Sequence, residues 1–338
     1  MSAIVPLPRA PEQAYHPATY RGRVGQYAGQ LHEVRWGYYK GWAHGQVRRA
    51  IVRKRWFQVV AATEHLTLVV RLQDDGTTGH GRVLILDRAH GGGPLQVHGT
   101  GAPLRTLGVG PMAGEGTDAF LRIDAQRIEL TRDLGEDAWH LSVDVDGLSL
   151  EATLDSEEAP TPSLVIGEAR DPFRHRPGLT QRSPLLALTG QGTLRGVPWV
   201  LEGTGSVAYT NVFLPPSTTG RVLSAEGHGL ALAVTDGDLL GDTHEATLWV
   251  DGQPYGLPRV HLLHDDPTGL WRAVSGDGSV RLRFKPLARQ RSVADRRFGW
   301  VHHDSRWMAG QLTGTVAGPS GPLEVDLPAL AEIHRIRG

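Results

Sequence analysis

The sequence predicts an all-β protein made of two tandem antiparallel β-barrels. Short segments that alternate apolar and polar residues recur along the whole chain, which is the signature of half-buried strands. The 43 glycines and 22 prolines fall between these segments at short intervals, as expected for many turns. An internal repeat also places similar hairpins in both halves. No segment shows a three-turn amphipathic helix, and one short helix is expected over residues 328–335.

Composition limits the class of protein. The 338 residues are enough for two domains, and 40% hydrophobic with 21% charged residues is ordinary for a globular protein with a sizeable core. The absence of cysteine excludes disulfides, thiolate catalysis and thiolate metal sites. The first residues lack the pattern of a signal peptide, and the apolar runs are too short to cross a bilayer. We therefore expect a cytoplasmic protein.

The order of the segments suggests the domain limits. Residues 1–30 are rich in proline and glycine without periodicity, and we expect an extended N-terminal arm. Residues 31–160 are expected to form the first barrel, residues 161–185 a linker, and residues 186–338 the second barrel. The strands expected in the two barrels are 53–62, 66–73, 82–87, 119–124, 127–132, 139–145 and 148–154, then 197–201, 206–214, 229–234, 246–250, 259–263, 271–274, 280–284, 308–316 and 323–327.

The internal repeat supports two equivalent halves. RIELTRDLGEDAW at residues 127–139 aligns without a gap with RVHLLHDDPTGLW at residues 259–271. Each final tryptophan is followed by a short strand, an Asp-Gly turn and another alternating strand. Chance similarity between two hairpins is the alternative. Duplication explains more, and it predicts that Trp139 and Trp271 occupy equivalent positions.

Four segments carry a resemblance to a known family: RKRWFQVVAAT, ATLWVDGQPYGLPRVHLL, GDGSVRLRFKP and RWMAGQLTGTVAGPSGPLEV. They resemble the bacterial family named domain of unknown function 2804, over most of the chain. More remotely, the chain is similar to the carotenoid hydratase and AttH group of two lipocalin-like barrels. Some members of that group hydrate or cyclise isoprenoid or polyketide substrates between the barrels. The resemblance therefore implies two lipocalin-like barrels and a small, largely apolar ligand.

One stretch departs from that group. Residues 207–220, VAYTNVFLPPSTTG, contain no acid and no tryptophan, where an acidic, tryptophan-rich stretch is expected. A shared fold does not carry a shared reaction. The departure therefore favours a non-catalytic module over an enzyme.

An aromatic and basic stretch at residues 35–63 is the first candidate site. It holds three Trp, two Tyr and seven Lys or Arg, with no acid between Glu33 and Glu64. Aromatic faces suit an apolar or cationic ligand, and arginine suits an anionic end. Alternatively, the tryptophans fill the barrel core and the arginines form a solvated rim. Nucleic-acid binding also uses such residues, but the net charge is −1 and no binding motif is present, so none is expected.

A second cluster, WVHHDSRW at residues 300–307, contains acid–base groups. On a strand, His302 and Asp304 share one face while His303 takes the other. A His–Asp pair can transfer protons near neutral pH, although the cluster also suits a polar turn before the last strands. His261 and His264 are three apart and diverge on a strand, so they are not expected to share a metal. No cofactor or metal is expected.

Two hypotheses follow for function. The first is binding and transformation of a small, largely apolar molecule by hydration, cyclisation or isomerisation; the second is a non-catalytic binding or structural module descended from such an enzyme. The site is expected at a barrel mouth or at the seam between the barrels. The candidate catalytic residues are His302, His303 and Asp304, and the candidate ligand-binding residues are Trp36, Tyr39, His44, Arg55, Trp56, Tyr209 and Asn211.

Overall fold

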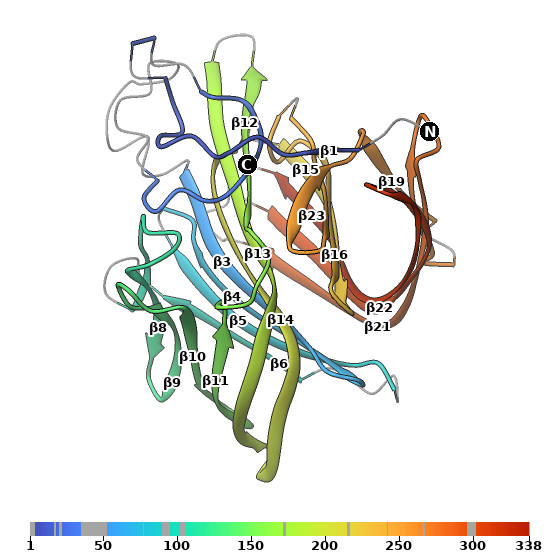
Figure 1. Cartoon of the computed structure of the whole chain (residues 1–338). Coiled ribbons are helices and arrows are strands. Elements are labelled where there is room, and N and C mark those ends of the chain that lie inside the picture. The colour runs from blue at the N-terminus through green and yellow to red at the C-terminus, as the bar shows by residue number, and fades with distance from the viewer. Residues whose placement is uncertain are drawn as a thin grey trace.

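The computed structural model describes residues 4–16, 18–19, 22–34, 53–76, 78–89, 95–101, 106–171, 174–214, 217–241, 243–265, 268–295 and 302–337. These residues form strands, turns and loops without a helix, and the strands pair antiparallel in two sheets. Both sheets curl into half-barrels that pack against each other (Figure 1). The predicted all-β fold is confirmed.

The first sheet has 13 strands in the order β6-β5-β4-β3-β14-β13-β11-β10-β9-β8-β7, with β12 paired to β13 and β2 paired to β12. Its chain order runs from β2 to β14. The bounds are β2 Gly25–Ala28, β3 Arg53–Ala62, β4 Leu66–Asp74, β5 Gly79–Asp87, β6 Leu95–Gly101, β7 Leu107–Val109, β8 Thr117–Ile123, β9 Gln126–Arg132, β10 Ala138–Val145, β11 Leu148–Asp155, β12 Ser163–Asp171, β13 Arg174–Leu194 and β14 Val197–Phe213.

The second sheet has 10 strands in the order β1-β18-β17-β16-β15-β23-β22-β21-β20-β19. The bounds are β1 Val5–Pro6, β15 Ser217–Gly227, β16 Leu230–Gly237, β17 Glu245–Val250, β18 Gln253–Gly256, β19 Val260–His264, β20 Trp271–Ser275, β21 Val280–Asp295, β22 His302–Gly318 and β23 Gly321–Arg337. The prediction of a short helix over residues 328–335 is wrong, because this segment lies inside β23 and pairs with both β22 and β15. Its apolar residues alternate and fill a strand face.

Alternation of apolar and polar residues decides which face of each strand is buried. In β10, Leu141 and Val143 are buried, while His140 and Asp144 on the other face are exposed. The inward residues of the first sheet form one core that includes Trp139, and those of the second form another that includes Trp271. Each half-barrel therefore has its own hydrophobic core.

The two halves share their strand order and one hairpin register. Leu130 pairs with Leu141 in the first sheet, and the aligned residues Leu262 and Ala273 pair in the second. In each sheet the last strand of the half also pairs with its first long strand: β14 pairs with β3, and β23 pairs with β15. Trp139 and Trp271 thus occupy equivalent positions in their hairpins, as the repeat predicts.

The chain changes sheet between Phe213 and Ser217. Residues 161–185, expected as a linker, contain β12 and the beginning of β13, which both belong to the first sheet. The N-terminal segment contacts both halves: β1 pairs with β18, and β2 pairs with β12. Figure 1 shows this segment running from the β12 end of the molecule to the second sheet.

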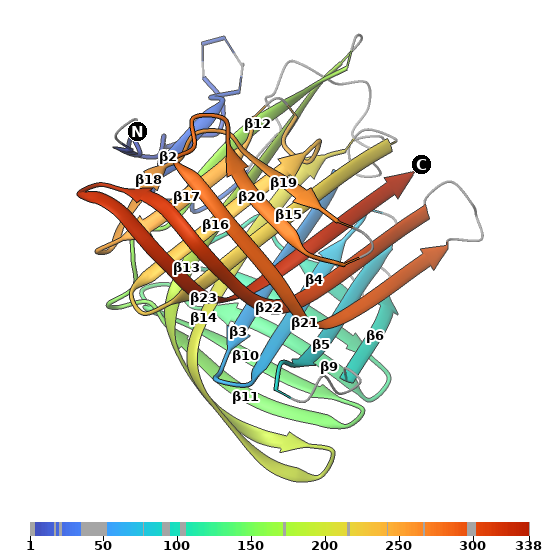
Figure 2. The ribbon, with the colours of Figure 1, turned by 90° about the vertical axis from the view of Figure 1, so that its right-hand side faces the viewer.

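The outward faces of β3, β4 and β5 meet the second sheet along a seam (Figure 2). Leu84 and Leu86 of β5 pack there against Trp307 and Leu330. In a second contact, β12 packs against the loop after β16, where the backbones of Glu168 and Gly241 form an isolated parallel β-bridge. The seam therefore buries side chains that lie on the outside of each half-barrel.

Gly167 allows the close approach of β12 to that loop. A Cβ atom at this position would overlap the backbone carbonyl oxygen of Leu240, which cannot move unless the loop after β16 moves with it. We expect Gly167→Ala to lower the free energy of unfolding by about 1–3 kcal/mol, as overpacking does. Urea titration measures this. Gly276→Ala is the control, because nothing lies within 4 Å of its added Cβ and its stability should be unchanged; equal effects at both sites would contradict the close contact.

No helix in the described part of the chain is long and apolar enough to cross a membrane.

Candidate active site

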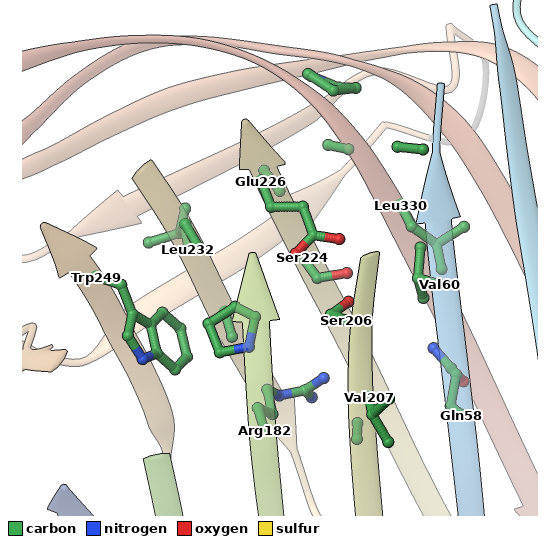
Figure 3. A pocket seen from close by; sticks show the side chains of 18 of the residues that line it. Gln58, Val60, Arg182, Ser206, Val207, Ser224, Glu226, Leu232, Trp249 and Leu330 are labelled. Atoms are coloured by element: carbon green, nitrogen blue, oxygen red, sulfur yellow. The ribbon is translucent and has the colours of Figure 1, made fainter. Parts of the chain in front are cut away.

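A cavity lies in the seam, between strands of the two sheets (Figure 3). Its walls come from β3, β4, β13 and β14 on one side and from β15, β16, β17 and β23 on the other. The volume of the cavity is about 570 Å³ when its open side is included, but it is so narrow that little of this volume is accessible to a water molecule. We call this narrow, mostly apolar cavity the first slot.

Glu226 is the one acid among the described residues that line the first slot. Its side chain lies beside Ser224 and Ser206 in Figure 3, and the residue is 7% exposed. Oε2 accepts a hydrogen bond of 3.1 Å from the Leu185 amide, whereas Oε1 has no hydrogen-bond partner among the described residues. Burial raises the pKa of Glu226 to about 7, although the Leu185 amide, the Ser206 hydroxyl and Arg182 oppose the shift. The carboxyl group can therefore hold or release a proton near neutral pH.

A β-bulge in β13 supplies the Leu185 amide. The pairing of β13 with β14 shifts register between Ser183 and Leu186. Leu185 has a φ of 54°, in the left-handed region that leucine rarely adopts. The bulge takes the Leu185 amide out of the ladder, and the amide bonds Glu226 on the other sheet. Bulges often re-aim groups in this way beside functional sites.

A second slot continues from the first along β3. The two cavities share Gln58, Arg182 and Ala208 in their linings. The second slot is as narrow as the first and more polar. Its remaining lining residues are Trp56, Arg71, Thr180, Thr210, Val222, Thr235, Leu239, Leu240, Glu332 and His334.

A buried ion pair between Arg71 and Glu332 lies in the second slot. The atoms are 2.6 Å apart, and the side chains are 7% and 2% exposed. Glu332 also accepts hydrogen bonds from Gln58, from the Trp307 indole N–H and from His334. Burial alone would raise the pKa of Glu332, but Arg71, His334 and Gln58 together hold it well below the usual range. Glu332 is therefore ionised, and burial lowers the pKa of His334, so that its ring is neutral at pH 7.

A second buried ion pair joins the two sheets. Arg182 of β13 donates to both carboxylate oxygens of Glu245 on β17, at 2.6 and 3.1 Å. Thr235 donates a further hydrogen bond of 2.6 Å to Glu245. The two arginines that line the slots are thus each neutralised by one glutamate.

Among the described residues, no three His, Asp or Glu side chains converge in an arrangement that could hold a metal ion.

A family model matches residues 19–337, and its description is Domain of unknown function (DUF2804). The chain belongs to the DUF2804 family. No protein in the curated set matches the sequence significantly.

Three solved structures share the fold of this DUF2804 protein. Kievitone hydratase from Nectria haematococca aligns with a TM-score of 0.53 at 12% identity, over 86% of this chain and 92% of its own. A putative AttH from Nitrosomonas europaea gives 0.53 at 13% identity, over 85% and 92%. CghA gives 0.55 at 12% identity, over 97% of both chains. The predicted membership of DUF2804 and the remote similarity to the AttH group are confirmed, and at these identities the likeness concerns the fold.

The DUF2804 structure separates two neighbouring residues that the sequence analysis grouped in one cavity. Trp56 points into the seam, where it lines the second slot and lies 5.7 Å, centroid to guanidinium carbon, from Arg71. Arg55 precedes it on β3, points to the opposite face and forms an ion pair with Asp74. Both side chains of this ion pair therefore lie inside the first half-barrel. Trp36, Tyr39 and His44 lie outside the described residues.

Tyr209 and Asn211 share the inner face with Arg55. Asn211 pairs directly with Arg55 across β14 and β3, and its Nδ2 donates a hydrogen bond of 3.1 Å to the Tyr209 hydroxyl. The Tyr209 ring packs 4.7 Å from that of Phe57, and burial raises the pKa of Tyr209 to about 12. These three predicted residues therefore lie together inside the first half-barrel, on the other side of the sheet from the slots.

The predicted catalytic cluster lies on β22. Asp304 is 5% exposed and binds Arg291 through two hydrogen bonds of 3.0 Å. The hydrogen bond from Arg291 holds the pKa of Asp304 below its usual range, so Asp304 is suited to be an ionised partner rather than an acid. The backbone of His302 and His303 belongs to β22, while their side chains lie outside the described part. Their proposed catalytic role stays a prediction.

Sequence reasoning missed Glu226, Arg182, Glu332 and His334. Glu226 follows Val222 and Ser224 on the face of β15 opposite to the core residues Leu223 and Ala225. A polar residue on that face is normally solvated, and only the packing of the second sheet onto the first buries it. The local signal was the bulge sequence Ser183-Pro184 in β13, since a proline within a strand marks an irregular position.

Proposed function

We propose that the protein binds a small, largely apolar molecule in the first slot and transforms it by acid catalysis with Glu226 as the proton donor. The observation that carries the proposal is the free Oε1 atom of a buried carboxyl group in a mostly apolar cavity. A pKa of about 7 leaves a large fraction of this group protonated at neutral pH. The predicted small apolar ligand fits this arrangement.

Glu226 suits proton transfer to an alkene or a carbonyl group. In hydration, the Glu226 proton would bond to one alkene carbon, water would add to the other carbon, and the proton released by that water would return to Glu226. In cyclisation or isomerisation, the cationic substrate would instead lose a proton from a neighbouring carbon to the Glu226 carboxylate, which restores the acid. The Leu185 amide stabilises the carboxylate left after proton transfer, because it already bonds Oε2. A hydratase among the proteins of similar fold supports this class of reaction.

The narrowness of the slots supports the second candidate function, a non-catalytic binding or structural module. The enclosed part of each slot has room for only one or two water molecules. Side chains must therefore move before a larger molecule enters. A module of this kind would bind ligand without forming product, or would bind none.

Mass spectrometry after incubation with alkene panels in ¹⁸O-labelled water separates the two candidates. An enzyme should give products that carry the label, or isomers of unchanged mass. Glu226→Gln should slow product formation by about 10²–10⁴-fold, the usual contribution of general acid–base catalysis. Glu202→Gln is the matched control, because Glu202 is an exposed glutamate on β14 and should leave the rate unchanged. Product formed equally by both variants would contradict the role of Glu226.

Cytoplasmic location and the absence of nucleic-acid binding stay predictions from the sequence.

A further inference from the structure

We propose that the ligand of the seam is an uncharged, thin molecule up to about 20 Å long, whose hydroxyl or carbonyl end binds beside Thr180 and Thr210. This inference rests on the proposed function, because it places the apolar body of the same ligand against Glu226. Three features of the slots support it: their length, their charge and one free hydroxyl hydrogen.

The length follows from one row of side chains on β3. Trp56 and Gln58 line the second slot, and Gln58, Val60 and Ala62 line the first. The six residue-to-residue steps from Trp56 to Ala62 extend about 20 Å along the strand. Ala208 belongs to both linings and has the smallest side chain of the three residues they share, so a ligand that spans both slots would pass over it. A thin chain or a flat ring system displaces fewer side chains from such a track than a globular ligand does.

The charge of the second slot is balanced before any ligand binds. Arg71 is paired with Glu332, and Arg182 with Glu245. Burial keeps His334 neutral through its lowered pKa. Arg82 is a further cation nearby; it lies over the Trp307 ring at 4.2 Å and lines neither slot. A charged end of a ligand would therefore be desolvated without an unpaired partner, which is costly.

The threonine pair supplies the polar contact. Thr180 and Thr210 are each 5% exposed, and their hydroxyl oxygens are 3.1 Å apart. One hydroxyl donates to the other, so the second O–H remains free to donate, since no other hydrogen bond of these hydroxyls exists among the described residues. A ligand oxygen can accept it. Trp56 pairs with Thr210 in the ladder and adds an aromatic surface beside this end.

Binding of five probes that share one fifteen-carbon isoprenoid chain tests the inference. The probes are farnesol, farnesal, farnesoate, farnesylamine and the hydrocarbon farnesene, and calorimetry measures each dissociation constant on the full chain. We expect farnesol and farnesal to bind about 5-fold tighter than farnesene, from one net hydrogen bond, and at least about 10-fold tighter than the two charged probes.

Two variants assign the preference to the threonines. Thr180→Val with Thr210→Val removes both hydroxyls at once, which is nearly neutral for stability, and farnesol should then bind only as well as farnesene. Thr153→Val with Thr189→Val is the matched control, because this cross-strand pair lies on β11 and β13 away from the slots and should leave the preference unchanged. Ala208→Leu should weaken farnesol binding by obstructing the passage.

The outcomes separate this inference from the proposed function. Tightest binding of farnesoate or farnesylamine, equal binding of farnesol and farnesene, or no binding of any probe overturns the inference. A retained preference for farnesol without any effect of Glu226→Gln on product formation refutes only the acid catalysis. A preference for farnesoate together with loss of turnover in Glu226→Gln refutes only the uncharged end.

Discussion

Replacing Glu332 by alanine is expected to lower the free energy of unfolding by about 3–5 kcal/mol, because the change leaves a buried arginine without its partner. Arg71 and Glu332 are 2.6 Å apart and almost fully buried in the seam. The variant also removes the acceptor for the Trp307 indole N–H and for His334. Urea titration at pH 7 measures the loss.

Glu129→Ala is the control for this prediction. Glu129 also pairs with arginines, Arg122 and Arg127, but these are 58% and 57% exposed. Solvent screens such pairs, and the loss should stay below about 1 kcal/mol. Similar losses for Glu129→Ala and Glu332→Ala would contradict the importance of burial. Glu332→Leu combined with Arg71→Met should recover part of the stability, since no uncompensated charge remains.

The same pair predicts a loss of stability in acid. The pKa of Glu332 is lowered in the folded protein, so the folded state binds fewer protons than the unfolded state. The stabilisation is therefore complete above the unfolded pKa near 4.5 and is lost as the pH falls below it. His334 acts in the same direction, because its lowered pKa keeps it neutral while the unfolded histidine gains a proton below about pH 6.5.

Glu226→Gln is expected to stabilise the protein at alkaline pH, by up to about 3 kcal/mol for a pKa difference of this size. The pKa of Glu226 is raised from 4.5 to about 7, so the folded state binds more protons than the unfolded state between these values. Stability contributed by the protonated carboxyl is complete below about pH 4.5 and is lost as the pH rises through 7. Glutamine keeps the acceptor for the Leu185 amide and cannot ionise.

Thermal or urea unfolding from pH 5 to pH 9 measures this effect. The variant should exceed the wild type in stability by less than about 1 kcal/mol at pH 5, and by up to about 3 kcal/mol at pH 9. Glu202→Gln should follow the wild type throughout, because Glu202 is exposed. A variant that is less stable than the wild type at pH 9 would show that Glu226 is ionised and well solvated in the folded protein.

The strands were predictable because each one has its own apolar face. Residues 139–145 and 148–154 alternate between apolar and polar side chains, and an Asp-Gly turn joins them. Neighbouring residues therefore determine both the hairpin and its register. The repeat showed the equivalence of Trp139 and Trp271 because duplicated hairpins keep their spacing. The helix prediction for the last segment was wrong because its sequence, ALAEIH, suits either a helix or a strand. Backbone pairing with β15 and β22 makes this segment a strand.

The position of the functional residues depended on contacts between distant segments. Arg55 and Trp56 are neighbours in the sequence, but a strand sends them to opposite sides of the first sheet. Tyr209 and Asn211 lie with Arg55, as sequence reasoning grouped them, yet inside a half-barrel rather than at the seam. Periodicity identifies two faces of a strand, but it does not show which outward face another sheet will cover.

The sequence by itself determined an all-β chain with a duplicated hairpin and a seam between two curled halves as one of two places for a site. Only the tertiary structure shows that the side chains of Glu226, Arg182 and Glu332 are buried away from solvent. Each lies on the outward face of its strand, where a charged residue is ordinary. The packing of the second sheet onto the first removes water from that face. Loss of water shifts the pKa of a carboxyl group and makes the loss of one partner of an ion pair costly for stability.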